Sequence, residues 1–374
     1  MAGIYIHIPF CRKACHYCDF HFSTSLSGID EMVKAMASEL QLKAQLFENE
    51  AVETIYFGGG TPSLLSAAQL GVLLETINEN YTLNLKEVTL EANPDDISTE
   101  SLTDWKSLGI NRLSIGLQTF HNKTLAWMNR IHSAEEGRNS VKLAQDFGFD
   151  NLSLDLIFNI PQSSEKDLQE DIDSLLALDP QHISAYNLTI EPQTVFGKRK
   201  KKGELKELND EQSATQFLLV RNHLQSAGFE SYEVSNFAIP GREALHNTNY
   251  WFQVPYLGIG PSAHGMIGNI RTANVANNAL YIRSLKENKL AGTEEILSPA
   301  DLANEMILTQ LRTKWGLNLK ELRTKTGIDM VYQHQDNLNS FQNLDLLYFQ
   351  KDTTYLTDKG ILLADYIAMQ LMVS

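Results

Sequence analysis

The chain has 374 residues, of which 43% are hydrophobic, and this is enough for one large domain and a smaller one. Its 46 acidic residues outnumber its 31 basic residues, and the formal net charge of −15 argues against general affinity for nucleic-acid phosphates. No apolar run approaches the roughly 18 residues that cross a bilayer, and no charged-then-apolar leader opens the chain. We therefore expect a cytoplasmic protein that does not bind nucleic acid.

Short apolar runs alternate with amphipathic segments from residue 3 to about residue 190. This alternation is typical of repeated β/α units around a parallel sheet, and six such units are fewer than the eight of a closed barrel. The sequence therefore predicts an α/β fold with an open, partial (β/α)6 barrel. The predicted strands are residues 4–8, 53–57, 87–91, 112–117, 151–156 and 183–188, and the helices between them are residues 31–47, 67–79, 100–107, 134–146 and 165–177.

Several predicted helices are flanked by residues with capping preferences. Ser133 is followed three positions later by Glu136, which is the pattern of a capping box. The other predicted caps are Ser66 and Thr99 at helix N-termini, and Gly109 and Gly148 at helix C-termini.

The pattern changes after residue 192. Residues 198–202 are five cationic side chains in a row, which we expect to form a solvated loop tip. Peripheral docking to an anionic membrane surface or an acidic partner is the alternative. A helix at residues 211–227 and a glycine- and aromatic-rich stretch at 232–268 follow. The predicted divisions are a core at 1–234, a connecting segment at 235–290 and a smaller, mainly helical C-terminal domain at 291–374.

All three cysteines of the chain, Cys11, Cys15 and Cys18, lie within eight residues. A four-iron cluster is normally held by four cysteines, so three leave one iron free to bind a substrate or cofactor. The C-x3-C-x2-C spacing resembles that of the radical S-adenosylmethionine (SAM) superfamily. A zinc site completed by His16 or His21 is the alternative. The odd cysteine count disfavours a disulfide framework.

Candidate ligand residues follow the predicted strands one after another. In parallel β/α folds, ligands bind at the carboxyl ends of the strands. The cysteine loop follows the first strand, and residues 58–62, Gly-Gly-Gly-Thr-Pro, follow the second and allow close backbone approach to a headgroup. Glu91 and Arg130 suit the ammonium and carboxylate of an amino-acid headgroup. A structural hydrogen bond is the alternative for any single residue. The other strand-end candidates are Gln118 and Asp155, which suit ribose hydroxyls, and Asn187.

Five motifs extend the resemblance over nearly the whole chain. They are Tyr-x-His-x-Pro-Phe-Cys, Gly-Gly-Gly-Thr-Pro, Glu-Ala-Asn-Pro, Gly-Leu-Gln and Leu-Asp-Leu-Ile. They resemble the radical SAM branch that contains oxygen-independent coproporphyrinogen III oxidase and the heme chaperone HemW. The resemblance implies a [4Fe-4S] cluster held by Cys11, Cys15 and Cys18. It also implies SAM contacts from Tyr5, Tyr17, Gly59, Gly60, Thr61, Glu91, Gln118, Arg130, Asp155 and Asn187.

Two features distinguish the members of this branch. The oxidases carry a further cysteine two residues after the third cluster cysteine, whereas this chain has Phe20 there. Residues 246–251, His-Asn-Thr-Asn-Tyr-Trp, match the H-N-x-x-Y-W signature of the heme chaperones. The resemblance therefore implies a chaperone that binds heme and passes it to acceptor proteins, respiratory ones among them, with the oxidase as the alternative.

The second motif also has a physical rationale. Heme needs an axial ligand and flat apolar surfaces for its faces, and His246 is followed closely by Tyr250 and Trp251. A packed core histidine is the alternative. The predicted heme residues are His246, Asn247, which we expect to orient the histidine, and Tyr250, and the rival iron ligand is His264 in a glycine-rich loop.

Overall fold

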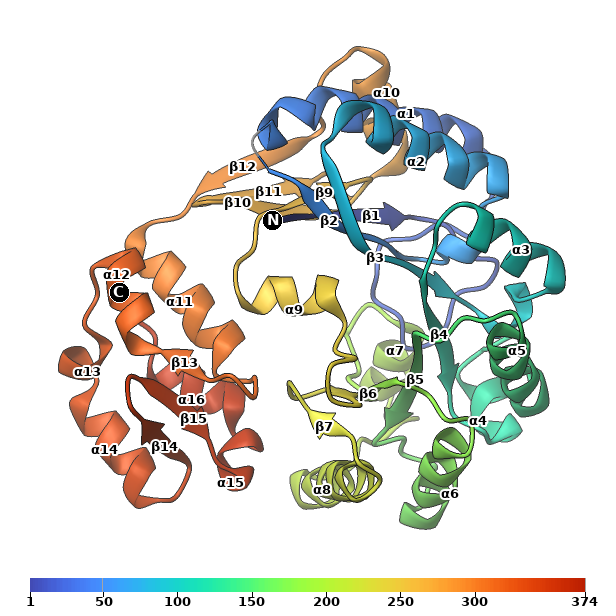
Figure 1. Ribbon diagram of the computed structural model, residues 1–374. Coiled ribbons are helices and arrows are strands. Elements are labelled where there is room, and N and C mark those ends of the chain that lie inside the picture. The colour runs from blue at the N-terminus through green and yellow to red at the C-terminus, as the bar shows by residue number, and fades with distance from the viewer. Residues whose placement is uncertain (49, 374) are drawn as a thin grey trace.

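The computed structural model describes residues 1–48 and 50–373 and is drawn in Figure 1. Six parallel strands form the middle of one large curved sheet, and all six occur where the sequence predicts strands. The sheet has two free ends in its strand order, so the expected open barrel is confirmed. The six strands are β1 (Ala2–Ile8), β2 (Val52–Gly59), β3 (Leu83–Ala92), β4 (Arg112–Gln118), β5 (Leu152–Phe158) and β6 (His182–Asn187).

Helices cover the outer face of this curved sheet (Figure 1). Their apolar faces join the strands in one core cluster, in which Leu70 and Leu73 of the second helix are fully buried. Burial of such a face, more than helix propensity, stabilises helices of this length. The helices are α1 (Ile29–Lys43), α2 (Ala67–Asn80), α3 (Thr99–Ser107), α5 (Ala134–Asp146) and α6 (Glu165–Leu176), with the short α4 (Asn122–Trp127) and three 3-10 turns, η1 (Ala44–Phe47), η2 (Pro62–Leu64) and η3 (Pro94–Asp96), between them.

Most predicted caps are present. Ser66 and Ser133 both form capping boxes, and Gly109 and Gly148 adopt positive φ angles of 81° and 77° just beyond the ends of α3 and α5. The prediction for Thr99 is wrong, because Thr99 is the first residue of α3 and the cap is the preceding serine, whose hydroxyl accepts from the backbone of Ser101.

The sheet continues beyond the six parallel strands at both edges, giving twelve strands. On the β6 side it adds β8 (Asn236–Ala238) and β7 (Glu230–Ser231), both antiparallel. On the β1 side it adds β9 (Tyr256–Ile259), which is parallel to β1, and then three antiparallel strands. These are β10 (His264–Ile267), β11 (Ile270–Asn274) and β12 (Gly292–Ile296), and the helices of this part are α8 (Asp210–Ser226), α9 (Leu245–Trp251) and α10 (Asn278–Lys286).

The basic run is not a loop, and the sequence prediction is wrong here. Residues 195–201 form the helix α7 (Val195–Lys201), capped by the hydroxyl of Thr194, which accepts from the backbone N–H of Gly197 at 3.0 Å. Phe196 is fully buried and stacks on Trp127 with ring centroids 4.0 Å apart, which anchors the helix. The cations lie at its C-terminal end, where the helix dipole favours positive charge.

The C-terminal region has its own hydrophobic cluster. It is mainly helical, as predicted, and it also contains a small three-stranded sheet that the sequence did not indicate. The exact divisions at residues 234 and 290 stay predictions. The elements are α11 (Pro299–Gln310), β13 (Leu317–Asn318), α12 (Leu319–Thr326), α13 (Met330–Gln333), α14 (Gln335–Asn343), β14 (Leu347–Gln350), β15 (Thr353–Leu356), α15 (Asp358–Ile361) and α16 (Ala364–Gln370).

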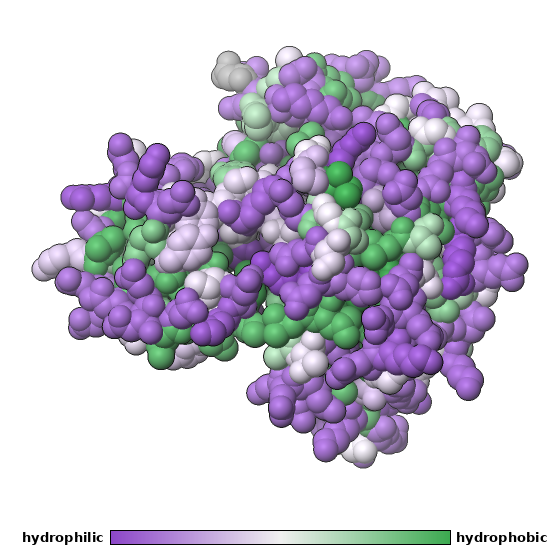
Figure 2. Space-filling model, turned by 60° about the horizontal axis from the view of Figure 1, so that its bottom comes forward, coloured by the Kyte–Doolittle hydropathy of each residue, from purple (hydrophilic) through white to green (hydrophobic). Residues whose placement is uncertain are grey.

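The face of the molecule drawn in Figure 2 is largely polar. Hydrophobic residues show mostly toward the middle of the view. Every helix within residues 1–48 and 50–373 is too short or too polar to cross a bilayer.

Candidate functional site

A cavity of about 360 Å³ lies at the carboxyl ends of the parallel strands and brings most of the predicted site residues together. This volume falls within the range of about 300–1,000 Å³ that is typical of small-molecule sites. All three cysteines line it. The predicted SAM residues that also line it are Tyr17, Gly59, Gly60, Thr61, Glu91, Gln118, Arg130, Asp155 and Asn187.

The cysteine loop is held in place from the far side of the barrel. The side-chain amide of Asn129 donates to the backbone oxygen of Ala14 at 2.7 Å. The backbone N–H of His16 donates to the backbone oxygen of Met128 at 3.0 Å. These bonds tie the loop after β1 to the segment after α4, so the cysteines do not depend on their own short loop for position. Preorganised ligands of this kind favour metal binding.

The cysteines fit the ligand set of an iron-sulfur cluster with one open iron. Burial raises the pKa of the Cys11 thiol to about 12 and that of the Cys18 thiol to about 11, so these two thiols are neutral at pH 7 in the ligand-free fold. The Nη1 atom of Arg130 lies 3.5 Å from Sγ of Cys15, which places a positive charge beside the thiols. Because the chain has no fourth cysteine, a cluster bound here keeps one iron without a cysteine ligand.

Glu91 is a half-buried carboxylate in the wall of the cysteine cavity. The hydroxyl of Tyr56 donates to it at 2.8 Å, and the backbone N–H of Gly59 donates to its other oxygen at 3.2 Å. Burial raises the pKa of Glu91 to about 7, and the nearby carboxylate of Asp155 acts in the same direction. A ligand that brings an ammonium group would restore the charged form.

Asp155 lies two strands away from Glu91 on the same cavity wall. Ser114 donates to one of its oxygens at 3.3 Å, and burial raises its pKa to about 6. Two half-buried carboxylates with raised pKa values on one cavity are costly to keep charged without a ligand, which makes them candidates for a ligand site.

Arg130 is positioned by two acceptors. Its Nη2 atom donates to the backbone oxygen of Gly116 at 2.7 Å and to the side-chain oxygen of Asn93 at 2.8 Å. Asn93 in turn donates to the hydroxyl of Thr61 at 3.3 Å, so one network joins the residues that follow β2, β3 and β4.

Backbone geometry at two of the predicted positions also fits a ligand site. A Cβ atom on Gly60 would lie only 2.7 Å from the backbone oxygens of Ile8 and Phe10, so only glycine fits beside the cysteine loop. Gln118 ends β4 with a φ of 71°, a conformation that costs energy in a residue other than glycine and that clusters at ligand sites. Asn187 accepts from the side chain of Asn159 at 2.8 Å.

Tyr5 does not line the cysteine cavity. Its ring lies beside Tyr56, with centroids 6.0 Å apart, and it lines a second cavity together with Tyr250. Its predicted contact with SAM stays a prediction.

The predicted heme residue His246 is almost fully buried, at 1% exposure. Its Nδ1 atom hydrogen-bonds with the hydroxyl of Thr54 and its Nε2 atom with the hydroxyl of Tyr250, both at 2.8 Å. Burial lowers its pKa to about 3, so the ring is neutral. Asn247 is half-buried. The helix α9 that carries these residues lies inside the curve of the sheet (Figure 1).

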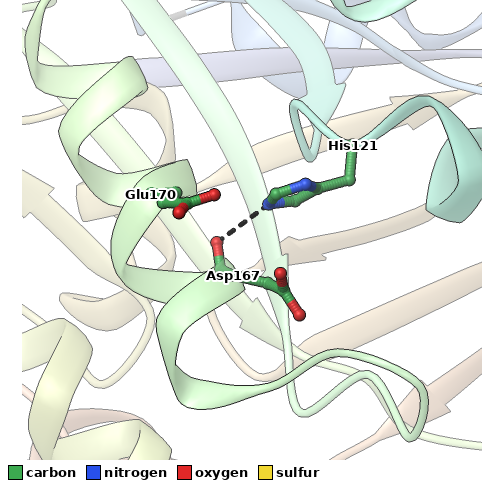
Figure 3. Close-up of side chains that lie close together, drawn as sticks. All are labelled: His121, Asp167 and Glu170. Carbon is green, nitrogen blue, oxygen red and sulfur yellow. Dashed lines mark hydrogen bonds between the residues drawn. The ribbon is translucent and has the colours of Figure 1, made fainter.

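A separate group of metal-binding side-chain types lies away from both cavities. It consists of His121, Asp167 and Glu170, at the start of α4 and along α6 (Figure 3). The Nε2 atom of His121 donates to the backbone oxygen of Asp167 at 3.0 Å, the bond drawn in Figure 3, so the ring already serves to join the two helices.

Comparison with known proteins places the chain in a family. The family model of the radical SAM superfamily matches residues 5–175, and that of the HemN C-terminal domain matches residues 297–363. The heme chaperone HemW of Bacillus subtilis is 37% identical over 372 residues, covering 98% of both chains. The chain belongs to the HemW family. HemW of Lactococcus lactis is 35% identical over 366 residues, covering 97% of this chain and 95% of that one.

The fold agrees with this membership. The coproporphyrinogen III oxidase HemN of Escherichia coli, described as a radical SAM enzyme, superposes with a TM-score of 0.86 over 100% of this chain and 90% of that chain. The two are 24% identical, so this likeness concerns the fold. The sequence prediction of family and fold class is thereby confirmed.

Several residues of the cysteine cavity were missed from the sequence, among them Asn93, Ser114 and Tyr186. Asn93 stands two positions after Glu91, and Ser114 two before the Gly116 whose oxygen holds Arg130. Side chains two positions apart point to the same face of an extended chain. Counting in steps of two from Glu91 would have found Asn93.

Proposed function

We propose that this chain is a heme chaperone that carries a [4Fe-4S] cluster with SAM at its open iron, and that it passes heme to acceptor proteins. The observation that carries the proposal is similarity to HemW proteins over 98% of the chain, together with three cysteines and two half-buried carboxylates on one cavity. A bound cluster and SAM would supply one-electron chemistry at this site.

Different residues of the cysteine cavity bind the cluster and the SAM headgroup. Cys11, Cys15 and Cys18 hold the cluster, and the missing fourth ligand leaves an iron for the cofactor. Glu91 binds the ammonium of the headgroup and Arg130 its carboxylate, because each is half-buried at the cavity and preorganised by hydrogen bonds.

The remaining polar groups suit the nucleoside part of SAM. Asp155 and Gln118 face the ribose hydroxyls from neighbouring strands, and Asn187 follows on the next strand. Gly60 allows the strand-2 loop to pack directly against the backbone of Ile8 and Phe10, which holds this loop beside the cysteines.

The two alternatives have less support. Phe20 replaces the additional cysteine of the oxidases, and the relatives from Bacillus subtilis and Lactococcus lactis, 37% and 35% identical over nearly the whole chain, are named heme chaperones. For zinc, neither His16 nor His21 is among the residues that line the cysteine cavity. His16 already donates Nδ1 to the backbone oxygen of Trp127 at 2.8 Å.

The test begins with anaerobic reconstitution. We expect about four irons and four sulfides per chain, and loss of both when Cys11, Cys15 and Cys18 are changed together to Ala. A full cluster in that triple variant would contradict the assignment.

The chaperone function is tested by heme titration of the cluster-loaded protein, followed by transfer to an apo-heme protein. We expect binding and transfer, and no conversion of coproporphyrinogen III in the presence of SAM and a reductant. Failure to bind heme, or clear formation of protoporphyrinogen IX, would overturn the proposal.

A further inference from the structure

A second cavity, of about 520 Å³, adjoins the cysteine cavity, and the side chain of Phe20 lines both. Phe20 is 66% exposed and stands between the two cavities, where an apolar ligand in either one would cover it. The walls come from β1, from the residues after the cysteine loop, from α9 and the segment after it, from β9 and β10, and from α11. This cavity is therefore assembled from parts of the chain that are far apart in sequence.

Flat aromatic side chains form much of its wall. Tyr250 and Tyr256 meet edge to face, with ring centroids 4.6 Å apart at 76°, and Trp251 lies next to them on α9. Met266 pairs with Tyr256 across the β9–β10 contact. Walls of this kind suit a planar apolar ligand.

Two polar atoms at this cavity are buried without a partner. Nε1 of Trp251 and Nε2 of Gln253 have no hydrogen bond to any of the described residues. Both residues line the cavity. Buried donors are normally satisfied, and these two lie behind the cavity surface, so they leave polar capacity in the wall of the cavity without themselves contacting it.

Three histidines line the cavity, and they differ in how their rings are used. His7 hydrogen-bonds through both nitrogens, to the backbone oxygen of His21 at 2.8 Å and to the hydroxyl of Tyr5 at 3.2 Å. His21 itself hydrogen-bonds through Nε2 to Asn278 at 2.7 Å. His264 is exposed, and its ring makes no hydrogen bond within the part of the chain that the structure describes.

His264 is also held on a rigid element. It begins β10, whose backbone pairs with β11 from His264 to Ile267, and Met266 lies on the same face of that strand two positions on. The loop before it is fixed by a buried ion pair, because Glu39 accepts from the backbone N–H of Gly260 at 2.8 Å and Lys43 donates to the backbone oxygen of Gly258 at 2.9 Å.

His246, in contrast, does not line this cavity, and both of its ring nitrogens are hydrogen-bonded to side chains. To bind iron it would have to give up at least one of these bonds and turn away from Thr54 of β2 or from Tyr250. Tyr250, its partner, is the residue that faces the cavity.

We propose that this second cavity is the heme site, that His264 is the residue that ligates the heme iron, and that His246 only positions Tyr250 from behind the wall. The inference rests on the proposed function, since it takes heme as the ligand, and it names the cavity and the iron ligand. Neutral imidazole is a common axial ligand of heme iron.

The charges around the cavity bear on which edge of a bound heme would face the solvent. Asp19 and Glu305 line it, and no Lys or Arg is among the described residues that do. Glu305 is paired with Arg271. The heme propionates are therefore expected at the solvent-facing mouth, with the apolar edge of the ring inside. Such a heme is held by few charged contacts, which suits release to an acceptor.

The test is a titration of the cluster-loaded protein with ferric heme under anaerobic conditions, followed by difference absorption spectra. His264→Ala should weaken heme binding about 10- to 100-fold or more and remove the spectral signature of imidazole ligation. His246→Gln should keep the wild-type spectrum. The matched control is His334→Ala, a histidine that lines neither cavity.

The outcomes separate this inference from the function on which it rests. If the wild-type protein binds no heme, the proposed function fails. If the wild type binds heme and His264→Ala keeps its affinity and spectrum, this inference alone is overturned. It is likewise overturned if folded His246→Gln loses the imidazole spectrum while His264→Ala retains it. Circular dichroism of each variant establishes that it is folded.

Discussion

The ring of His246 stacks on the ring of Tyr56, with centroids 5.3 Å apart and planes at 30°. Tyr56 in turn donates its hydroxyl to Glu91 at 2.8 Å. The helix α9 therefore supports the floor of the cysteine cavity, and the histidine of its motif acts through a neighbour and not by touching a ligand of that cavity.

The first prediction concerns stability. His246→Ala removes two buried hydrogen bonds and leaves a cavity, so we expect the free energy of unfolding to fall by about 2–4 kcal/mol. The measurement is thermal or urea denaturation. His264→Ala, at an exposed position, should change it by less than about 0.5 kcal/mol. Equal losses in the two variants would contradict the structural role of His246.

The second prediction concerns SAM affinity. Glu91→Gln and Arg130→Ala each remove one charged partner of the headgroup, so each should weaken binding by roughly 1.5–3 kcal/mol, or about tenfold or more, with the cluster intact. Calorimetry on cluster-loaded protein measures this. Unchanged affinity in both variants would mean that the headgroup is held elsewhere.

The third prediction concerns pH. In the ligand-free fold the pKa of Glu91 is raised to about 7, above its ordinary value of 4.5, so below pH 7 the carboxylate must lose a proton before it pairs with an ammonium. SAM affinity should therefore fall as the pH is lowered from 7, by up to about tenfold per pH unit. Glu91→Gln should remove most of this dependence. An affinity of the wild type that is flat between pH 6 and 7 would refute it.

The raised pKa of Glu91 also makes the stability of the ligand-free protein depend on pH, in the direction opposite to that of SAM affinity. Because the fold favours the protonated form of Glu91, this residue lowers stability progressively as the pH rises from 4.5 through about 7. Glu91→Gln should therefore raise the melting temperature of the ligand-free protein at pH 8 more than at pH 5.

The fourth prediction concerns the buried pair of Glu39 and Lys43, whose side-chain atoms are 2.6 Å apart. Lys43→Met leaves a buried carboxylate without its cation and should cost about 3–5 kcal/mol of stability. The matched control is Lys166→Met, which breaks an exposed pair of the same spacing with Glu170 and should cost about 0.5 kcal/mol or less. Similar melting temperatures for the two variants would rule out an anchoring role for the pair.

The parallel strands and the cysteine cavity could be predicted because their signals are local. Alternating apolar runs gave all six strands, and the strand ends placed Glu91, Gln118 and Asp155 on one cavity. The position of a residue at a strand end depends on the neighbouring few residues, so periodicity is sufficient.

The edges of the sheet could not be predicted in the same way. β9 to β12 are four or five residues long and rich in glycine, as in Gly258 and Gly265, so they carry little alternation. The helix α7 was missed because the five consecutive cations indicated a solvated loop, whereas the burial of Phe196 that anchors the helix depends on the fold.

The second cavity could not be predicted from the sequence, because the residues that line it are far apart in the chain and come together only in the folded structure. Phe20 and His264 are 244 positions apart in the chain, yet they line one cavity. The aromatic residues near His246 indicated a heme motif, but their pattern did not reveal that Tyr250 faces the cavity while the histidine is buried behind it.

The pairing of β1 has a consequence for synthesis of the chain. One edge of β1 is completed by β2, but the other is completed by β9, where Gly3 pairs with Tyr256. At about 5–20 residues per second, the ribosome needs roughly 13–50 s to deliver that partner. During this interval the nascent chain presents an open strand edge directly before its cysteines, and open edges recruit other chains. Cells that make this protein are therefore expected to shield its N-terminal segment until translation has passed residue 259.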